Sequence, residues 1–77
     1  MKTTTIKQIE FNDDCMQRIT IALDNIFVHI FINDMYEDST AFNADWEAEK
    51  FYENIKSNLV AEETDYKETI VKTSTSN

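Results

Sequence analysis

The sequence predicts an α+β domain, in which an antiparallel sheet of three or four strands carries one amphipathic helix on one face. Two observations predict this fold. Residues 18–24 alternate apolar and polar side chains and lead into a nearly continuous apolar run over 26–33, whereas apolar residues between 43 and 60 recur at helical spacing. With 77 residues, the chain has room for one domain, which we assign to 1–77.

The two strands at 18–24 and 26–33 are the most strongly patterned part of the chain. If Asp24-Asn25 is a two-residue hairpin loop, the apolar side chains of both strands share one face. The predicted pairs on that face are Leu23–Ile26, Ile21–Val28 and Ile19–Ile30, and those on the opposite face are Ala22–Phe27, Thr20–His29 and Arg18–Phe31.

The two ends of the chain carry weaker signals. Residues 3–11 are rich in Thr and Ile, which predicts a first strand, and the Asn-Asp-Asp sequence at 12–14 is typical of a turn. The β-branched segment 66–73 is expected to form either a last strand or a short helix.

The helix is predicted over 43–60, after a polar connection that begins at 33–38. Its expected N-terminal cap is one of three residues, Ser39, Thr40 or Asn43. One apolar stripe should lie on the sheet, formed by Ala44, Ala48, Phe51, Tyr52, Ile55 and Leu59.

Negative charge is concentrated in the second half of the chain. Fifteen acidic and seven basic residues give a net charge of −8, and residues 34–68 alone hold eleven acids against three lysines. A negative surface repels nucleic-acid phosphates and acidic membranes, so we expect no direct binding to either. The charge instead favours a basic protein partner, including proteins that hold nucleic acid. The alternative is that acidity only keeps a small protein soluble.

The predicted partner-binding surface combines the helix with the connection before it. Asp45, Glu49 and Glu53 are spaced four residues apart, so they are expected to line a strip opposite the apolar stripe and to imitate a row of phosphates. Trp46 is expected on the same outer face, as an interface anchor. The alternatives are an ordinary solvated helix face and a tryptophan covered by the tail. The acids expected nearby in the connection are Asp34, Glu37 and Asp38.

An alternative interface lies on the other face of the predicted sheet. Phe27, His29 and Phe31 share that face, and they form a small apolar binding surface if nothing covers them. Ile9 and Phe11 of the first strand, or a second copy of the chain, are the alternative covers. A homodimer would also enlarge the core of so short a chain.

Catalytic, cofactor and metal sites are not expected. Glycine is absent, which excludes the glycine-rich loops that cradle nucleotide phosphates. His29 is the single histidine and Cys15 the single cysteine, so zinc and triad patterns lack partners, and the acids at 34–38 lack the glycine and spacing of a calcium loop. We therefore expect a protein that is not an enzyme.

Taken as a type, the chain resembles the small, strongly acidic inhibitors made by bacteriophages: anti-CRISPR proteins, anti-restriction DNA mimics and uracil-DNA glycosylase inhibitors. The resemblance rests on the chain length, the charge of −8 concentrated in 34–68, and the acidic row beside Trp46. It implies a protein that occupies the basic nucleic-acid groove of an enzyme or effector complex.

A cytoplasmic location is the expectation from the remaining features. The segment that opens the chain at 1–5 is polar rather than an apolar signal core, and the apolar runs are too short to cross a bilayer. A lone thiol, Cys15, fits a reducing compartment.

Overall fold

The α+β class is confirmed by a computed structural model, which describes residues 2–75. These residues form one helix and a sheet of five strands, one more than the upper limit of the prediction. In chain order the elements are β1 (Lys2–Asn12), β2 (Arg18–Asp24), β3 (Phe27–Ile32), β4 (Met35–Ala41), α1 (Asp45–Ala61) and β5 (Tyr66–Thr75).

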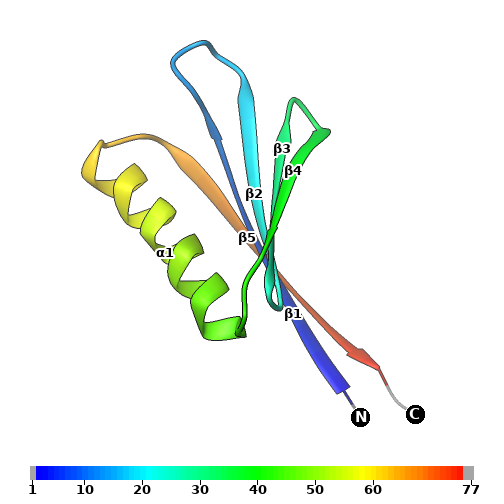
Figure 1. Cartoon of the computed structure of the whole chain (residues 1–77). Coiled ribbons are helices and arrows are strands. Elements are labelled where there is room, and N and C mark those ends of the chain that lie inside the picture. Colours follow the sequence, from blue (N-terminus) through cyan, green and yellow to red (C-terminus); the bar gives the residue numbers. More distant parts are fainter. Residues whose placement is uncertain (1, 76–77) are drawn as a thin grey trace.

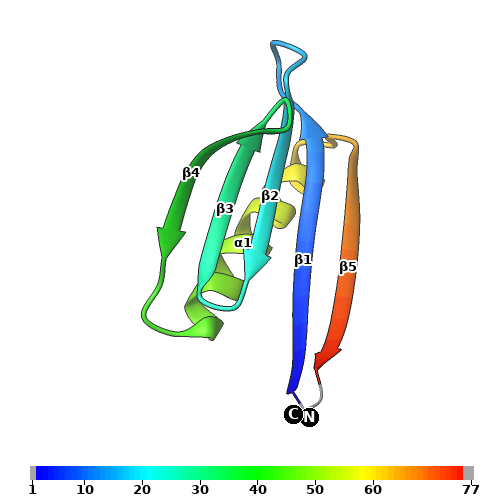
Figure 2. The ribbon, with the colours of Figure 1, turned by 90° about the vertical axis from the view of Figure 1, so that its right-hand side faces the viewer.

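The five strands form one antiparallel sheet in the order β4-β3-β2-β1-β5. The first four follow one another as neighbours, whereas β5 returns after the helix to pair with β1 (Figure 2). The β1–β5 pairing runs from Lys2 opposite Thr75 to Phe11 opposite Tyr66, so the first and last strands lie side by side along their length. The segment 66–73 is therefore part of a strand and not a helix.

Strand β4 is the element that the sequence did not predict, since its residues were assigned to the polar connection. Its seven residues, MYEDSTA, show no alternation of apolar and polar side chains. It is an edge strand that pairs only with β3, with an irregularity in register next to Ile30 and Phe31. Because an edge strand buries neither face fully, its sequence carries little hydrophobic pattern.

The β2–β3 hairpin is confirmed, but its predicted register is wrong by two residues. Asn25 and Ile26 form the turn in place of Asp24 and Asn25, and Asn25 takes a left-handed φ of 58° that asparagine tolerates. A shift of two residues leaves every side chain on its predicted face, because side chains alternate with period two. The observed pairs are Leu23–Val28, Ile21–Ile30 and Ile19–Ile32, with Ala22–His29 and Thr20–Phe31 on the other face.

The helix begins two residues later than predicted, and its N-cap position is Ala44, which makes no side-chain capping hydrogen bond. The predicted caps are therefore wrong: Ser39 and Thr40 lie within β4, and Asn43 precedes the cap position. Acidic Asp45 and Glu47 occupy the first turn, where they face the positive end of the helix dipole.

Helix α1 packs diagonally on one face of the sheet and buries most of the predicted stripe (Figure 1). Phe51 departs from the prediction, since it stays 39% exposed beside Phe42. The core side chains are Ile9 of β1, Ile21 and Leu23 of β2, Val28 of β3, and Ala48, Tyr52 and Leu59 of α1. The opposite face of the sheet has no helix on it.

Candidate protein-interaction surfaces

Trp46 stands on the outer side of α1, in the first turn of the helix. Its side chain is 62% exposed, and it lies about 160° around the helix axis from the buried Ala48. Strand β5 runs along β1, so the described part of the tail does not cover the indole ring. A large amphipathic ring is therefore free to contact another molecule.

The acidic row Asp45, Glu49 and Glu53 flanks the buried side of α1 rather than lying opposite to it, which corrects the prediction. Each four-residue step turns the row by about 40° around the axis, so it spirals along the side of the helix that faces β1. Asp45 and Glu49 are exposed and Glu53 is half-buried. The carboxylate Oε1 of Glu49 lies 3.7 Å from Lys7 Nζ on β1.

The acids of the predicted connection form a second group, separate from the helix. Asp34 lies in the β3–β4 turn with a left-handed φ of 68°, and its carboxylate pairs with the guanidinium of Arg18. Glu37 and Asp38 are exposed in β4. Seven strand residues separate Asp34 from the linker into α1, which corresponds to roughly 20 Å. The structure therefore splits the predicted continuous acidic surface into two.

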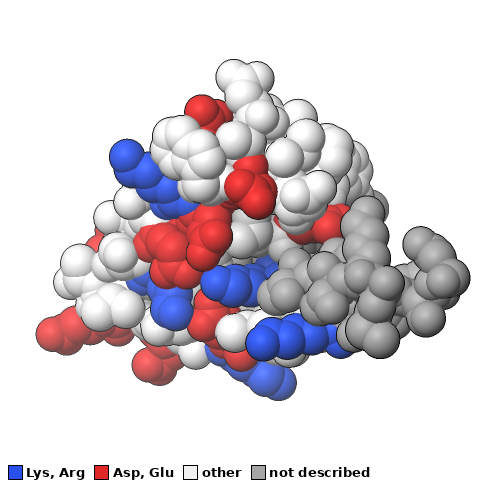
Figure 3. All heavy atoms as spheres, turned by 90° about the horizontal axis from the view of Figure 1, so that it is seen from below, with Lys and Arg blue, Asp and Glu red and all other residues white. Residues whose placement is uncertain are grey.

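Charges of both signs alternate on the underside of the molecule. Figure 3 views this side and shows acidic side chains gathered across its middle with lysine and arginine side chains between them. Partly exposed ion pairs such as Lys7–Glu49 contribute only about 0–1 kcal/mol. The Glu49 carboxylate can therefore exchange Lys7 for a cation of another molecule.

The sheet face opposite α1 carries the second candidate surface. Phe27 and His29 stack with ring centroids 5.9 Å apart, and Phe31 meets Tyr36 of β4 edge-on at 6.1 Å. Ser39 Oγ lies 2.6 Å from His29 Nδ1 and accepts a hydrogen bond from the Tyr36 hydroxyl at 2.9 Å. We call these five residues of β3 and β4 the aromatic face.

The first strand does not cover the aromatic face. Ile9 is fully buried in the core beneath α1, and Phe11 packs against the same core, so both point to the helix side. Tyr36 and Ser39 were missed from the sequence because β4 was not recognised as a strand. Tyr36 could have indicated a strand here, since aromatic residues favour strands, and it pairs with Phe31 of β3.

Hydrogen bonds between side chains join α1 to β5, away from the outer side of α1 and from the aromatic face. The hydroxyl of fully buried Tyr52 donates to Glu68 Oε2 at 2.8 Å, and Lys56 Nζ donates to Glu68 Oε1 at 2.9 Å. The hydrogen bond from Lys56, reinforced by that from Tyr52, lowers the pKa of Glu68. Burial and the contact with Glu68 raise the pKa of the Tyr52 phenol, and Glu68 also raises the pKa of Lys56.

Acid pH is expected to weaken this contact. Because the folded-state pKa of Glu68 is lowered, the unfolded chain binds a proton more readily at this carboxylate. The stabilisation is complete above the ordinary glutamate pKa of about 4.3 and is lost as the pH falls through the lower folded-state value. We expect Glu68→Gln to cost roughly 1 kcal/mol at pH 7 and to flatten the acid limb of the pH–stability curve.

Urea denaturation at a series of pH values measures this effect. Glu63→Gln, which removes an exposed carboxylate just beyond the helix, is the matched control and should leave the acid limb unchanged. An acid limb that is the same in Glu68→Gln as in the parent would contradict the prediction.

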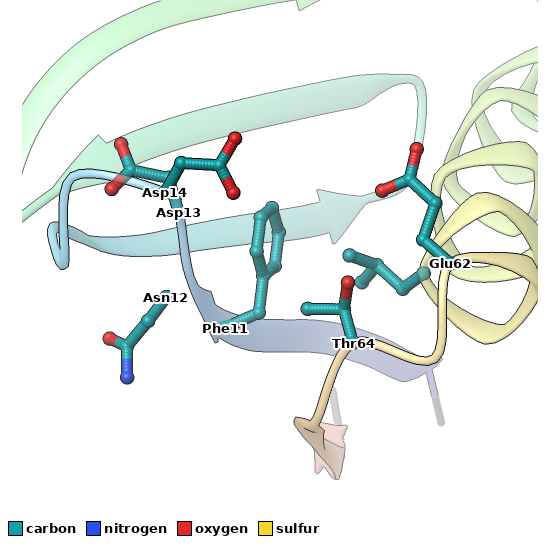
Figure 4. Close-up of a pocket in the computed structure, with 7 residues that line it drawn as sticks. Phe11, Asn12, Asp13, Asp14, Glu62 and Thr64 are labelled. Atoms are coloured by element: carbon teal, nitrogen blue, oxygen red, sulfur yellow. The ribbon is translucent and has the colours of Figure 1, made fainter.

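A shallow recess lies between the β1–β2 loop and the C-terminal end of α1 (Figure 4). Phe11 and Leu59 supply its apolar part, and polar side chains surround them. The carboxylate of Asp13 is already occupied, because it accepts the backbone N–H groups of Cys15 and Gln17 at 2.9 and 2.8 Å. The polar lining consists of Asn12, Asp13, Asp14, Glu62 and Thr64.

Three further observations complete the survey of the described residues. Among them, no three His, Cys, Asp or Glu side chains are grouped so that they could hold a metal ion. No helix in the same residues is both long and apolar enough to span a membrane. Cys15 is a free, exposed thiol in the β1–β2 loop.

Comparison with protein-family models, with curated proteins and with solved structures finds no match for this chain. The functional inference therefore rests on the chain's own surfaces.

Proposed function

We propose that this chain is a non-catalytic, cytoplasmic inhibitor or regulator that docks α1 onto a basic, nucleic-acid-handling protein and blocks its nucleic-acid site. Such a partner would be a CRISPR effector, a restriction enzyme or a repair enzyme. The observation that carries the proposal is the exposure of Trp46, 62%, directly beside the acidic row of α1. Tryptophan is enriched among the residues that dominate binding energy.

The charges of the chain supply the long-range part of the interaction. A net charge of −8 attracts a basic surface and speeds encounter. At contact, successive carboxylates of the acidic row are about 6 Å apart along the helix axis, and they meet the cations that otherwise hold phosphates. Glu49 is well exposed and lies 3.7 Å from half-buried Lys7, so exchanging this contact for a cation of the partner costs little.

The two acidic groups give the docking surface its breadth. Asp45, Trp46, Glu49 and Glu53 form the group on the helix, and Asp34, Glu37 and Asp38 form the group along β4. A partner groove that reaches both groups must extend over roughly 20 Å, which suits an elongated nucleic-acid channel better than a small pocket.

Binding is expected to weaken steeply with salt. Purified CRISPR effectors, restriction nucleases and uracil-DNA glycosylase are the partners to test, by isothermal titration calorimetry and by inhibition of their DNA cleavage or base release. For a partner that binds, we expect the dissociation constant to rise by a factor of at least about ten between 50 and 200 mM salt, as screening shortens the reach of the charges.

Charge reversal separates a specific surface from a general effect of acidity. Asp45→Lys with Glu49→Lys is expected to abolish inhibition, whereas Glu62→Lys with Glu63→Lys makes the same change in net charge beyond the other end of α1 and should preserve it. Equal losses from both double variants would mean that net charge alone acts. Salt-independent binding would rule out the electrostatic mechanism.

A further inference from the structure

The aromatic face is the most apolar part of the sheet side that α1 leaves open. Phe27 is 40% exposed and Tyr36 is 62% exposed, while His29 and Phe31 are half-buried between them. No described element crosses this side of the sheet (Figures 1 and 2). Thr20 of β2, which is half-buried, lies opposite Phe31 and continues the surface beyond β3.

The charge on this side of the sheet differs from that of the rest of the molecule. The strand register places four charged side chains of residues 6–72 there, two acidic and two basic, and Glu37 lies at the irregular edge of β4. The four sum to zero, and to −1 once Asp34, whose carboxylate pairs with Arg18, is counted, in a chain whose net charge is −8. They are Glu10 and Arg18, which pair at 3.4 Å, together with Asp24 and Lys67.

We propose that a second copy of this chain covers the aromatic face, so that two sheets pack face to face across a two-fold axis. Two copies that met through their acidic helices would bring like charges together. Contact through this side of the sheet, which carries little net charge, avoids most of that repulsion. The same low charge gives a basic partner little acid to bind there. Each aromatic side chain then contributes twice, as it does in any isologous interface.

The size of the face suits such a contact. A standard interface takes about 800 Å² from each partner, which is roughly one seventh of the 5652 Å² accessible surface of this chain. Five strands at about 4.8 Å spacing and six residues at about 3.4 Å rise give the whole open side of the sheet a projected area near 500 Å², and upright side chains increase its accessible area. The contact would therefore extend from the aromatic face across β2 and β1 toward β5. Sheets that pack in this way lie about 10 Å apart and share an interior of interdigitated side chains.

The arrangement leaves the helix part of the proposed docking surface free, whereas Asp34, Glu37 and Asp38 lie at the β4 edge of the covered side. Helix α1 is on the far side of the sheet, so Trp46 and the acidic row would point outward from both copies. Dimerisation through the sheet can therefore be tested without any partner of the helix.

Sedimentation velocity over about 1 to about 300 µM is the primary test, since interfaces of this size have micromolar or tighter dissociation constants. His29 is the single histidine, so in an untagged protein its imidazole ring protons give one set of NMR signals at the centre of the face. We expect a dimer, with His29 signals that shift on dilution. A protein that stays monomeric across this range would overturn the proposal.

Two substitutions on the face and one elsewhere locate the contact. Phe31→Glu and Tyr36→Glu are each expected to raise the dissociation constant of the dimer. Each substituted side chain should raise it by about 30-fold, and because the substitution is present in both copies, the total is on the order of 10³-fold. Tyr36 is well exposed, so its substitution remains informative if Phe31→Glu fails to fold. Trp46→Glu makes the same change of an aromatic residue to a carboxylate on the helix side and should leave the dimer intact.

The result that supports the proposal is a dimer that both face variants dissociate and Trp46→Glu retains. A dimer that survives Phe31→Glu and Tyr36→Glu would place the contact elsewhere and overturn it. A dimer that Trp46→Glu dissociates as strongly as the face variants would also overturn it, because the helix side would then be the interface.

Discussion

Replacing Tyr52 with alanine is expected to remove a large part of the free energy of unfolding of this protein. Tyr52 has no exposed surface, and it is the largest fully buried side chain where α1 meets the sheet. Substitution of a buried aromatic residue by alanine costs about 3–5 kcal/mol, and a chain of this length is stable by roughly 4–12 kcal/mol. The hydrogen bond to Glu68 is lost as well, which leaves a half-buried carboxylate with Lys56 as its partner.

Urea denaturation followed by circular dichroism measures this loss, and Tyr52→Phe is the matched control. Phenylalanine keeps the ring in the core and removes only the hydroxyl donor, so it should cost about 1 kcal/mol. A Tyr52→Ala variant that is destabilised by no more than Tyr52→Phe would mean that the ring contributes little packing energy, and the described core would be wrong.

Replacing Trp46 with alanine is expected to weaken binding to the proposed partner by at least about 2 kcal/mol, which is roughly a 30-fold higher dissociation constant. The physical reason is that an exposed indole ring buries its whole surface only when the partner covers it. Folding should be unaffected, because the ring contributes nothing to the core. Calorimetric titration measures the two dissociation constants, with the partner that binds the parent protein in the tests above.

Val60→Ala is the control for Trp46→Ala. Val60 is 58% exposed on the same helix, at the end away from Trp46 and the acidic row, and its loss should leave the affinity unchanged. Binding that is equally tight with and without Trp46 would remove the main support of the proposed docking mode. A weaker affinity accompanied by lower stability would show that the ring acts through folding instead.

The elements with a strong hydrophobic period were predictable from the sequence. Residues 18–24 coincide with β2, and the helix at 43–60 agrees with Asp45–Ala61 within two residues, because each buries one clear face. The hairpin register was misplaced because the alternation of apolar and polar residues is the same in two registers that differ by two residues. In the observed register Asn25 is the first loop residue and has a left-handed φ. Strand β4 was missed because neither of its faces is buried.

The surfaces were predictable only in part, since sequence spacing does not say what lies beside a helix. The exposure of Trp46 agrees with its predicted direction, whereas Glu49 lies beside the sheet, where its carboxylate reaches Lys7 of β1. The aromatic side chains of β3 lie on the predicted face, but Tyr36 and Ser39 join them through a strand that the sequence did not reveal.

The order of strands has a consequence for how the chain acquires its structure. The middle strands can pair through short turns, but β1 receives its second neighbour only when residues beyond 65 have been made and have returned around the helix. Closing so long a loop is entropically slow. Until it closes, the outer backbone of β1 remains an open edge that another chain can pair with, so the risk of aggregation is concentrated in the last step of folding.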